Sequence, residues 1–95
     1  MRINEMKDAA MALSIFELWI DGQIDHNIAI PRLFNIPMLE EYQSKNYSAE
    51  FLDAFEEAVE YESIRSMMDK ECVVRTQTKI INGFKKAILD CLCEE

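Results

Sequence analysis

The sequence is almost free of the residues that interrupt regular structure. Its 95 residues include only two glycines and two prolines, which are the strongest local markers of turns and breaks. A chain with few turns must consist of long secondary-structure elements, and long helices are the simplest way to build them. Hydrophobic residues make up 49% of the chain, so we expect a folded core rather than disorder. We predict an all-α fold: a single acidic domain over residues 1–95, built as a small bundle of about four main helices.

The segment SAEFLDAFEEAVEYE, residues 48–62, predicts the best-defined helix. Ser48 is the expected N-cap, with Tyr47 and Leu52 at the spacing of a hydrophobic staple. At about 100° per residue the segment divides into two faces. The expected core face consists of Phe51, Phe55, Ala58 and Val59. The opposite face carries Asp53, Glu56, Glu57 and Glu60.

This acidic face has two interpretations. No lysine or arginine lies between Lys45 and Arg65, and like charges four residues apart slightly destabilise a helix. The face is therefore either a solvated surface that keeps the protein soluble or a docking surface for a basic partner. On the second hypothesis an aromatic side chain anchors the contact. The predicted partner-binding residues are Glu50, Asp53, Glu56, Glu57, Glu60 and Tyr61.

A first helix is expected from an N-cap at Asn4 to about Asp21, with Gly22 at the C′ position. Its apolar run, residues 9–20, is too short to span a bilayer, so we interpret it as a core helix. The expected core stripe is Met6, Ala9, Ala10, Leu13, Phe16 and Ile20. A wider set of apolar residues indicates burial on more than one side: Ile15, Leu18 and Trp19.

The connection after this helix contains both prolines. Pro31 and Pro37 push the preceding residues towards extended conformation, which argues against a continuous helix through either one and predicts an irregular, proline-punctuated connection. Each proline can instead open a short helix at its first position. The candidate helical pieces are a turn over residues 25–28 capped by Asp25, a turn over residues 31–35, and a better helix from Pro37 to about Ser44.

The acidic helix can continue as far as Glu71, and its apolar register changes on the way. Either the helix bends or breaks near Glu62 and Ser63, or its two halves contact different neighbours. The residues after the change are Ile64, Met67 and Met68. We expect them in the core, since apolar residues at helical spacing usually are. The alternative is an apolar interface, to which methionine adapts well.

A last helix is expected from Val73 or Thr76 to Cys93. Gly83 falls on the polar side of this helix, or Asn82-Gly83 forms a turn that divides it. The predicted core stripe is Val73, Val74, Ile80, Ile81, Phe84, Ile88, Cys91 and Leu92. Arg75, Lys79 and Lys86 share another face, interpreted as solvated charge rather than a ligand-binding patch.

The sequence gives little support for catalysis or metal binding. His26 is the single histidine, and Cys91 and Cys93 lack the second cysteine pair of a zinc site. We expect Cys91 in the core and Cys93 exposed. There is no glycine-rich phosphate loop and no nucleophile elbow. We therefore predict no metal, no cofactor and no enzymatic activity.

The net charge of −8 argues against direct binding to nucleic acid or anionic membranes. Three cysteines without framework spacing fit a reducing cytoplasm. In size and charge the chain resembles toxin-immunity proteins and phage-encoded anti-defence proteins. The first hypothesis is accordingly an inhibitor of a basic protein, such as a nuclease or another nucleic-acid-handling enzyme.

Two alternatives remain. The first is a self-associating helical module, such as a homodimer, whose sign is apolar surface left over at Trp19 with Leu18 or at Met67 with Met68. The second is a helix-turn-helix regulator, which the acidic composition opposes. It requires Arg65, Arg75, Lys79 and Lys86 to gather on one surface.

Overall fold

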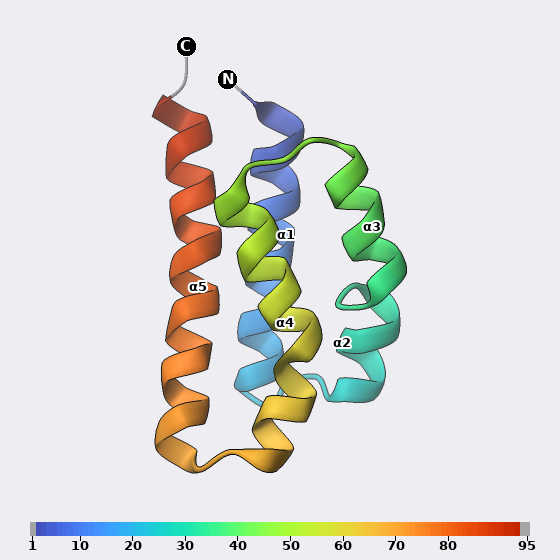
Figure 1. The fold of residues 1–95 in the computed structure, drawn as a ribbon, viewed down its shortest axis with the longest axis vertical. Coiled ribbons are helices and arrows are strands. Elements are labelled where there is room, and N and C mark those ends of the chain that lie inside the picture. The colour runs from blue at the N-terminus through green and yellow to red at the C-terminus, as the bar shows by residue number, and fades with distance from the viewer. Residues whose placement is uncertain (1, 94–95) are drawn as a thin grey trace.

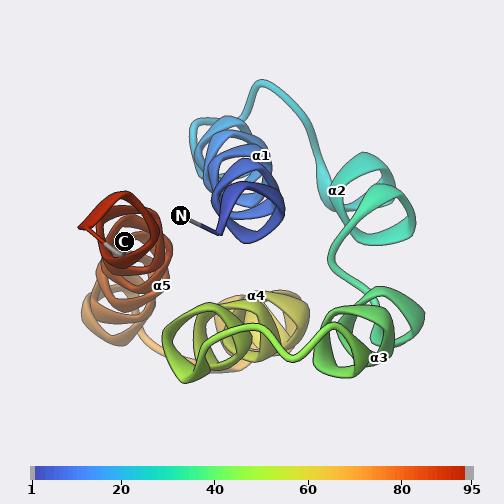
Figure 2. The same cartoon turned by 90° about the horizontal axis from the view of Figure 1, so that it is seen from above.

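The computed structural model describes residues 2–93, and all regular structure in this range is helical (Figure 1). This confirms the predicted all-α bundle. The helices are α1 (Ile3–Ile20), α2 (His26–Arg32), α3 (Ile36–Ser44), α4 (Ala49–Met67) and α5 (Lys70–Cys93). Seen from above, α5 lies between α1 and α4, while α2 and α3 connect α1 to α4 on the other side (Figure 2).

The core is unusually aromatic. Phe16 and Trp19 of α1 meet Tyr61 of α4 edge to face, with ring centroids 5.1 and 5.0 Å from that of Tyr61. Phe51 continues the cluster to Phe84 of α5, at 5.8 Å. Edge-to-face pairs add to the stabilisation from area burial alone. The aromatic residues of α4 thus bind it to both of the other long helices.

The core face of α1 is rotated from the predicted one. The buried residues are Glu5, Ala9, Ala12, Phe16 and Trp19, whereas Ala10 is exposed. The two alanines let neighbouring helices approach closely, which a count of bulky apolar residues does not reveal. Asn4 is not the N-cap, because α1 begins at Ile3 after Arg2. Gly22 follows the helix with a φ of 81°, so the predicted C′ glycine is confirmed.

The proline-containing connection is helical rather than irregular. Asp25 caps α2 by accepting from the backbone N–H of Asn27, as predicted, but Pro31 lies inside the helix instead of opening a new one. Proline is tolerated there because the helix ends one residue later, so few intrahelical hydrogen bonds are lost.

Asn35 joins α2 to α3. Its Nδ2 donates to the backbone oxygen of Ile30 at 2.8 Å, and its Oδ1 accepts from the backbone N–H of Met38 at 3.0 Å. One side chain therefore caps the end of one helix and the start of the next. Pro37 lies in the first turn of α3, and the helix predicted from Pro37 to about Ser44 is confirmed.

The chain turns at Met68 and Asp69, not near Ser63. Ser48 is the N-cap of α4 as predicted, and the helix continues without interruption to Met67. Asp69 then accepts from the backbone N–H of Cys72 at 2.8 Å, and α5 begins at Lys70, earlier than predicted. Asn82 and Gly83 form no turn, because α5 is continuous through them.

Gly83 faces α4 rather than the polar side of α5. A Cβ atom at this position would lie 2.7 Å from the Cβ of Ala54, closer than two carbon atoms can approach. The missing side chain therefore permits the close packing of α4 against α5. Between residues 2 and 93, no helix has the length and apolar character needed to cross a membrane.

Candidate functional site

The predicted acidic residues share the side of α4 that faces away from the core. Asp53, Glu56 and Glu60 are exposed, while Glu50 and Glu57 are half-buried at the boundary with α5. We call these five residues the α4 acidic face. Their helix is held by the buried Phe51, Phe55 and Ala58 on its opposite side. The carboxylates are thus displayed on a rigid, 19-residue element.

Tyr61 does not belong to this surface. Its side chain is only 2% exposed, and its hydroxyl accepts a hydrogen bond from Nε2 of Gln77 at 2.6 Å. The prediction of Tyr61 as an aromatic anchor for a partner is therefore wrong. The register change seen in the sequence reflects the position of Tyr61, whose ring packs against Phe16 and Trp19 of α1.

Lys79 of α5 supplies a cation at the edge of the α4 acidic face. Its Nζ lies 2.7 Å from Oε1 of Glu57. The hydrogen bond and charge of Glu57, together with the charge of Asp53, raise the pKa of Lys79. Sequence analysis missed this pair because the two residues are far apart in the chain. Glu57 is therefore partly neutralised. Within residues 2–93, no ion pair is made by the half-buried Glu50 or by the exposed Asp53, Glu56 and Glu60.

A small pocket of about 140 Å³ lies on this boundary. Glu50, Asp53 and Glu57 line one side, and Lys79 and Gly83 line the other. The pocket thus forms a depression beside the carboxylates. Such a depression can receive the end of a partner side chain, and the carboxylates favour a cationic one.

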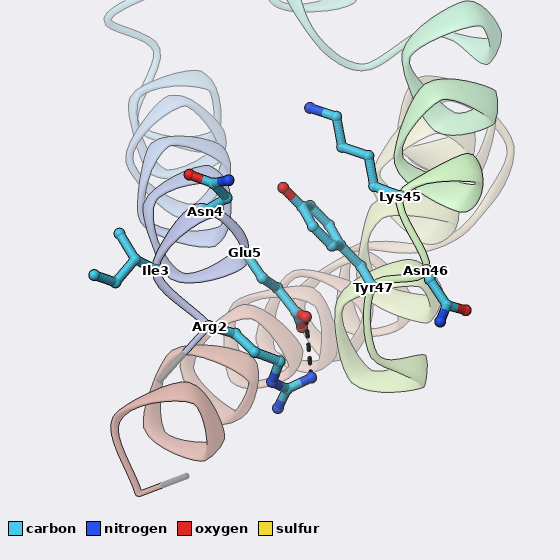
Figure 3. Close-up of a pocket in the computed structure, with 7 residues that line it drawn as sticks. All are labelled: Arg2, Ile3, Asn4, Glu5, Lys45, Asn46 and Tyr47. Atoms are coloured by element: carbon cyan, nitrogen blue, oxygen red, sulfur yellow. Dashed lines mark hydrogen bonds and ion pairs between the residues drawn. The ribbon is translucent and has the colours of Figure 1, made fainter. Parts of the chain in front are cut away.

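The N-terminus of α4 is fixed by a buried carboxylate that sequence analysis did not identify (Figure 3). Oε2 of Glu5 accepts from the Oγ of Ser48 at 2.5 Å and from its backbone N–H at 3.2 Å. Oε1 of the same group pairs with Arg2 at 3.0 Å. Ser48 in turn accepts from the N–H of Phe51. Glu5 thus extends the cap of α4 and ties it to α1.

Tyr47 strengthens the same junction. Its hydroxyl donates to Oδ2 of Asp8 at 2.6 Å, and its ring packs on those of Tyr42 and Phe51. Burial and the bond to Asp8 raise the pKa of Tyr47 well above that of free tyrosine. A pocket of about 460 Å³ opens here, lined by Arg2, Ile3, Asn4, Glu5, Lys45, Asn46 and Tyr47 (Figure 3). Arg2 pairs with Glu5 in its wall, and Lys45 and Tyr47 both contact Asp8, so we assign the junction a supporting role.

The predicted burial of Ile64, Met67 and Met68 is wrong for both methionines. Met67 is 82% exposed and Met68 53% exposed, whereas Ile64 is half-buried. The end of α4 extends beyond the aromatic core, so both methionines are exposed. They form a small apolar tip at the turn between α4 and α5.

A larger apolar groove of about 410 Å³ lies where α1, α2 and α3 meet. From α1 it takes Met11, Ile15 and Leu18, and from α2 it takes Ile28, Arg32 and Leu33. Ile24 and Met38 complete it. Leu18 is exposed here, as the self-association hypothesis required, but Trp19 is buried in the core.

The remaining groups considered in the sequence are the cysteines and the histidine. Cys91 is buried and Cys93 exposed, as predicted. Within residues 2–93, no three histidine, cysteine or acidic side chains are placed to hold a metal ion. Nδ1 of His26 lies 3.5 Å from Oε2 of Glu62.

The four basic side chains that a helix-turn-helix regulator would require, Arg65, Arg75, Lys79 and Lys86, each have a local partner. Lys86 pairs with Asp90 at 3.2 Å and Arg65 with Glu62 at 2.7 Å. Arg75 lies 3.6 Å from the Sγ of Cys72.

Comparison with protein-family models, curated proteins and solved structures finds no match to this chain. The proposed function therefore rests on the features of this protein's own surface.

Proposed function

We propose that this protein is a non-enzymatic binding protein that inhibits or neutralises a basic protein partner through the α4 acidic face. The observation that carries the proposal is the row of exposed carboxylates of Asp53, Glu56 and Glu60 on one rigid helix. These side chains make no ion pair within residues 2–93. They are therefore available to an external cation.

The physical basis is electrostatic complementarity. A surface of one sign raises the rate of encounter with an oppositely charged partner, and the net charge of −8 adds to this attraction. Basic clefts are typical of enzymes that handle nucleic acid, because these enzymes must neutralise phosphates. A nuclease or another such enzyme in the cytoplasm is thus the partner class that fits best. The size and charge fit an inhibitor of the toxin-immunity or phage anti-defence type.

The support of α4 favours this use. Binding sites work best on elements whose geometry is held by packing and hydrogen bonds. Here Glu5 and Ser48 fix one end of the helix, while Ala54 and Gly83 hold it close to α5. A rigid carboxylate row loses little conformational freedom on binding, which reduces the cost of association.

The experiment compares two variants of equal net charge. Asp53→Lys, Glu56→Lys and Glu60→Lys together reverse the α4 acidic face. Glu17→Lys, Glu40→Lys and Glu71→Lys reverse three exposed carboxylates on α1, α3 and α5 that likewise make no ion pair within residues 2–93. Each protein is immobilised and exposed to cell lysate at low salt, and captured proteins are quantified by mass spectrometry.

We expect the wild type and the control variant to enrich the same basic protein, and the α4 variant to lose it by at least about tenfold. Circular dichroism must show that all three proteins are equally folded. Equal recovery by the two variants would mean that the α4 acidic face is only a solvated surface.

A further inference from the structure

Helix α1 carries a second apolar stripe beside its core stripe. Met11, Ile15 and Leu18 recur at i, i+4 and i+7, a spacing that places them on one side of a helix. They line the groove between α1, α2 and α3, with Ile15 half-buried against the aromatic core and Met11 and Leu18 open to the surface. Met11 is 42% exposed and Leu18 43% exposed. Contiguous apolar surface of this kind marks interaction sites.

This stripe is complementary to a second copy of itself. If two α1 helices pack antiparallel about a point between Ser14 and Ile15, Met11 of each copy lies opposite Leu18 of the other. The two Ile15 side chains then lie close to the twofold axis. A surface patch that pairs with itself in this way defines an isologous interface. Methionine adapts its shape to such a contact.

Charged residues flank the stripe in the same register. Lys7 lies four residues before Met11, and Asp21 lies three residues after Leu18, on the same side of the stripe. Both are exposed, and neither makes an ion pair within residues 2–93. The antiparallel arrangement places Lys7 of one copy opposite Asp21 of the other. Each dimer therefore contains this charge pair twice.

We propose that the protein forms a homodimer by antiparallel packing of α1, with the Met11, Ile15 and Leu18 stripe of each copy seated against that of the other. The rim of the groove, including the exposed Ile28 of α2, adds apolar contact on each side. In the view from above, α1 and α2 lie on the opposite side of the molecule from α4 (Figure 2). The dimer thus keeps the α4 acidic faces apart, which limits the repulsion between two negatively charged chains.

Sedimentation equilibrium of the full chain over a wide concentration range tests the interface. We expect a dimer for the wild type and a monomer for Leu18→Arg, because the substitution buries two arginines against apolar surface. Leu89→Arg, at another exposed leucine on α5, is the matched control and should stay dimeric. A monomeric wild type at every concentration, or a Leu18→Arg protein that dimerises as well as the wild type, would overturn the proposal.

The register is tested by exchanging charges. Lys7→Asp and Asp21→Lys should each weaken dimerisation by about tenfold, since each creates two like-charge contacts. The double variant should recover most of the wild-type affinity. Recovery distinguishes the antiparallel α1 contact from general hydrophobic association, and no recovery would contradict this register.

The proposed dimer and the proposed function can be tested independently of each other. Reversal of the α4 acidic face should leave dimerisation intact, and Leu18→Arg should leave capture of the basic protein intact. If Leu18→Arg abolishes capture while the protein is monomeric throughout, the groove belongs to the partner rather than to a second copy.

Discussion

At the scale of single residues, Gly83 shows how packing can oppose local helix propensity. In an exposed helix, replacing glycine with alanine stabilises by about 1 kcal/mol. At Gly83 the new Cβ would lie 2.7 Å from Ala54, and overpacking of this kind costs about 1–3 kcal/mol. We therefore expect Gly83→Ala to lower the free energy of unfolding by about 1 kcal/mol, measured by urea denaturation.

The matched control removes the opposing methyl group. When Ala54→Gly is combined with Gly83→Ala, the helices keep one methyl group at the contact, so the two effects should be far from additive. If Gly83→Ala alone stabilises the protein, the helices are not held at this spacing.

We expect the folded protein to lose stability at alkaline pH because of the phenol groups of Tyr42 and Tyr47. Burial and the charge of Asp8 raise the pKa of Tyr42 from 10.0 to about 12 and raise that of Tyr47 as well. The folded state holds these protons more tightly than the unfolded state, so the stabilisation is complete below pH 10.0 and is lost as pH rises towards about 12. Urea denaturation at increasing pH should show this fall.

Replacing Tyr47 by phenylalanine should make the alkaline fall shallower. It should also lower stability at neutral pH by about 1 kcal/mol, because the hydrogen bond to Asp8 is lost. Tyrosinate absorbance checks which phenols ionise in the folded protein. An identical pH profile for Tyr47→Phe and the wild type would show that this residue does not contribute.

Several residues with a local role were predictable from the sequence, although the cap expected at Asn4 was wrong. The structure confirms Ser48 as an N-cap, Asp25 as a cap and Gly22 at a C′ position. Each was predictable because its role depends only on residues that are close to it in the sequence. Tyr61 and Lys79 were not predictable, since the position of each depends on a helix distant in sequence. The carboxylates of the α4 acidic face were correctly grouped, but their partial neutralisation was not foreseen.

At the scale of elements, Glu5 couples the start of α1 to the start of α4. Glu5→Ala removes the acceptor for both donors of Ser48. We expect a loss of about 2–3 kcal/mol, because buried donors without partners are costly. Hydrogen exchange should show the first turn of α4 losing protection. Glu5→Gln keeps one acceptor oxygen and should cost less, and equal losses for the two variants would contradict the capping role.

The long elements were predictable because the apolar period of a helix is a strong signal. Their limits were less predictable. Pro31 suggested a break, yet the short α2 accommodates it near its end. The apparent break near Ser63 reflects a change in the neighbours of α4. Near its start Phe51 contacts Tyr42 of α3, whereas Tyr61 contacts Phe16 and Trp19 of α1, and α5 lies alongside both parts.

At the scale of the whole molecule, the charged and apolar surfaces lie on different sides. Helix α4, which carries the α4 acidic face, lies across the bundle from α1 and α2 (Figure 2), and residues of α1 and α2 line the groove. One protein can therefore bind a basic partner and a second copy without competition between the two contacts. This division follows from the turn at Gly22, after which α2 and α3 lead the chain around to α4.

The measurement that tests the central claim most directly is the activity of the captured basic protein, assayed with increasing amounts of this chain. We predict that the wild type and the Glu17, Glu40 and Glu71 control variant abolish that activity at equimolar concentration. The Asp53, Glu56 and Glu60 variant should leave it unchanged at low salt. If the α4 variant inhibits as well as the wild type, or if the wild type binds without reducing activity, the account of an inhibitory acidic face is wrong.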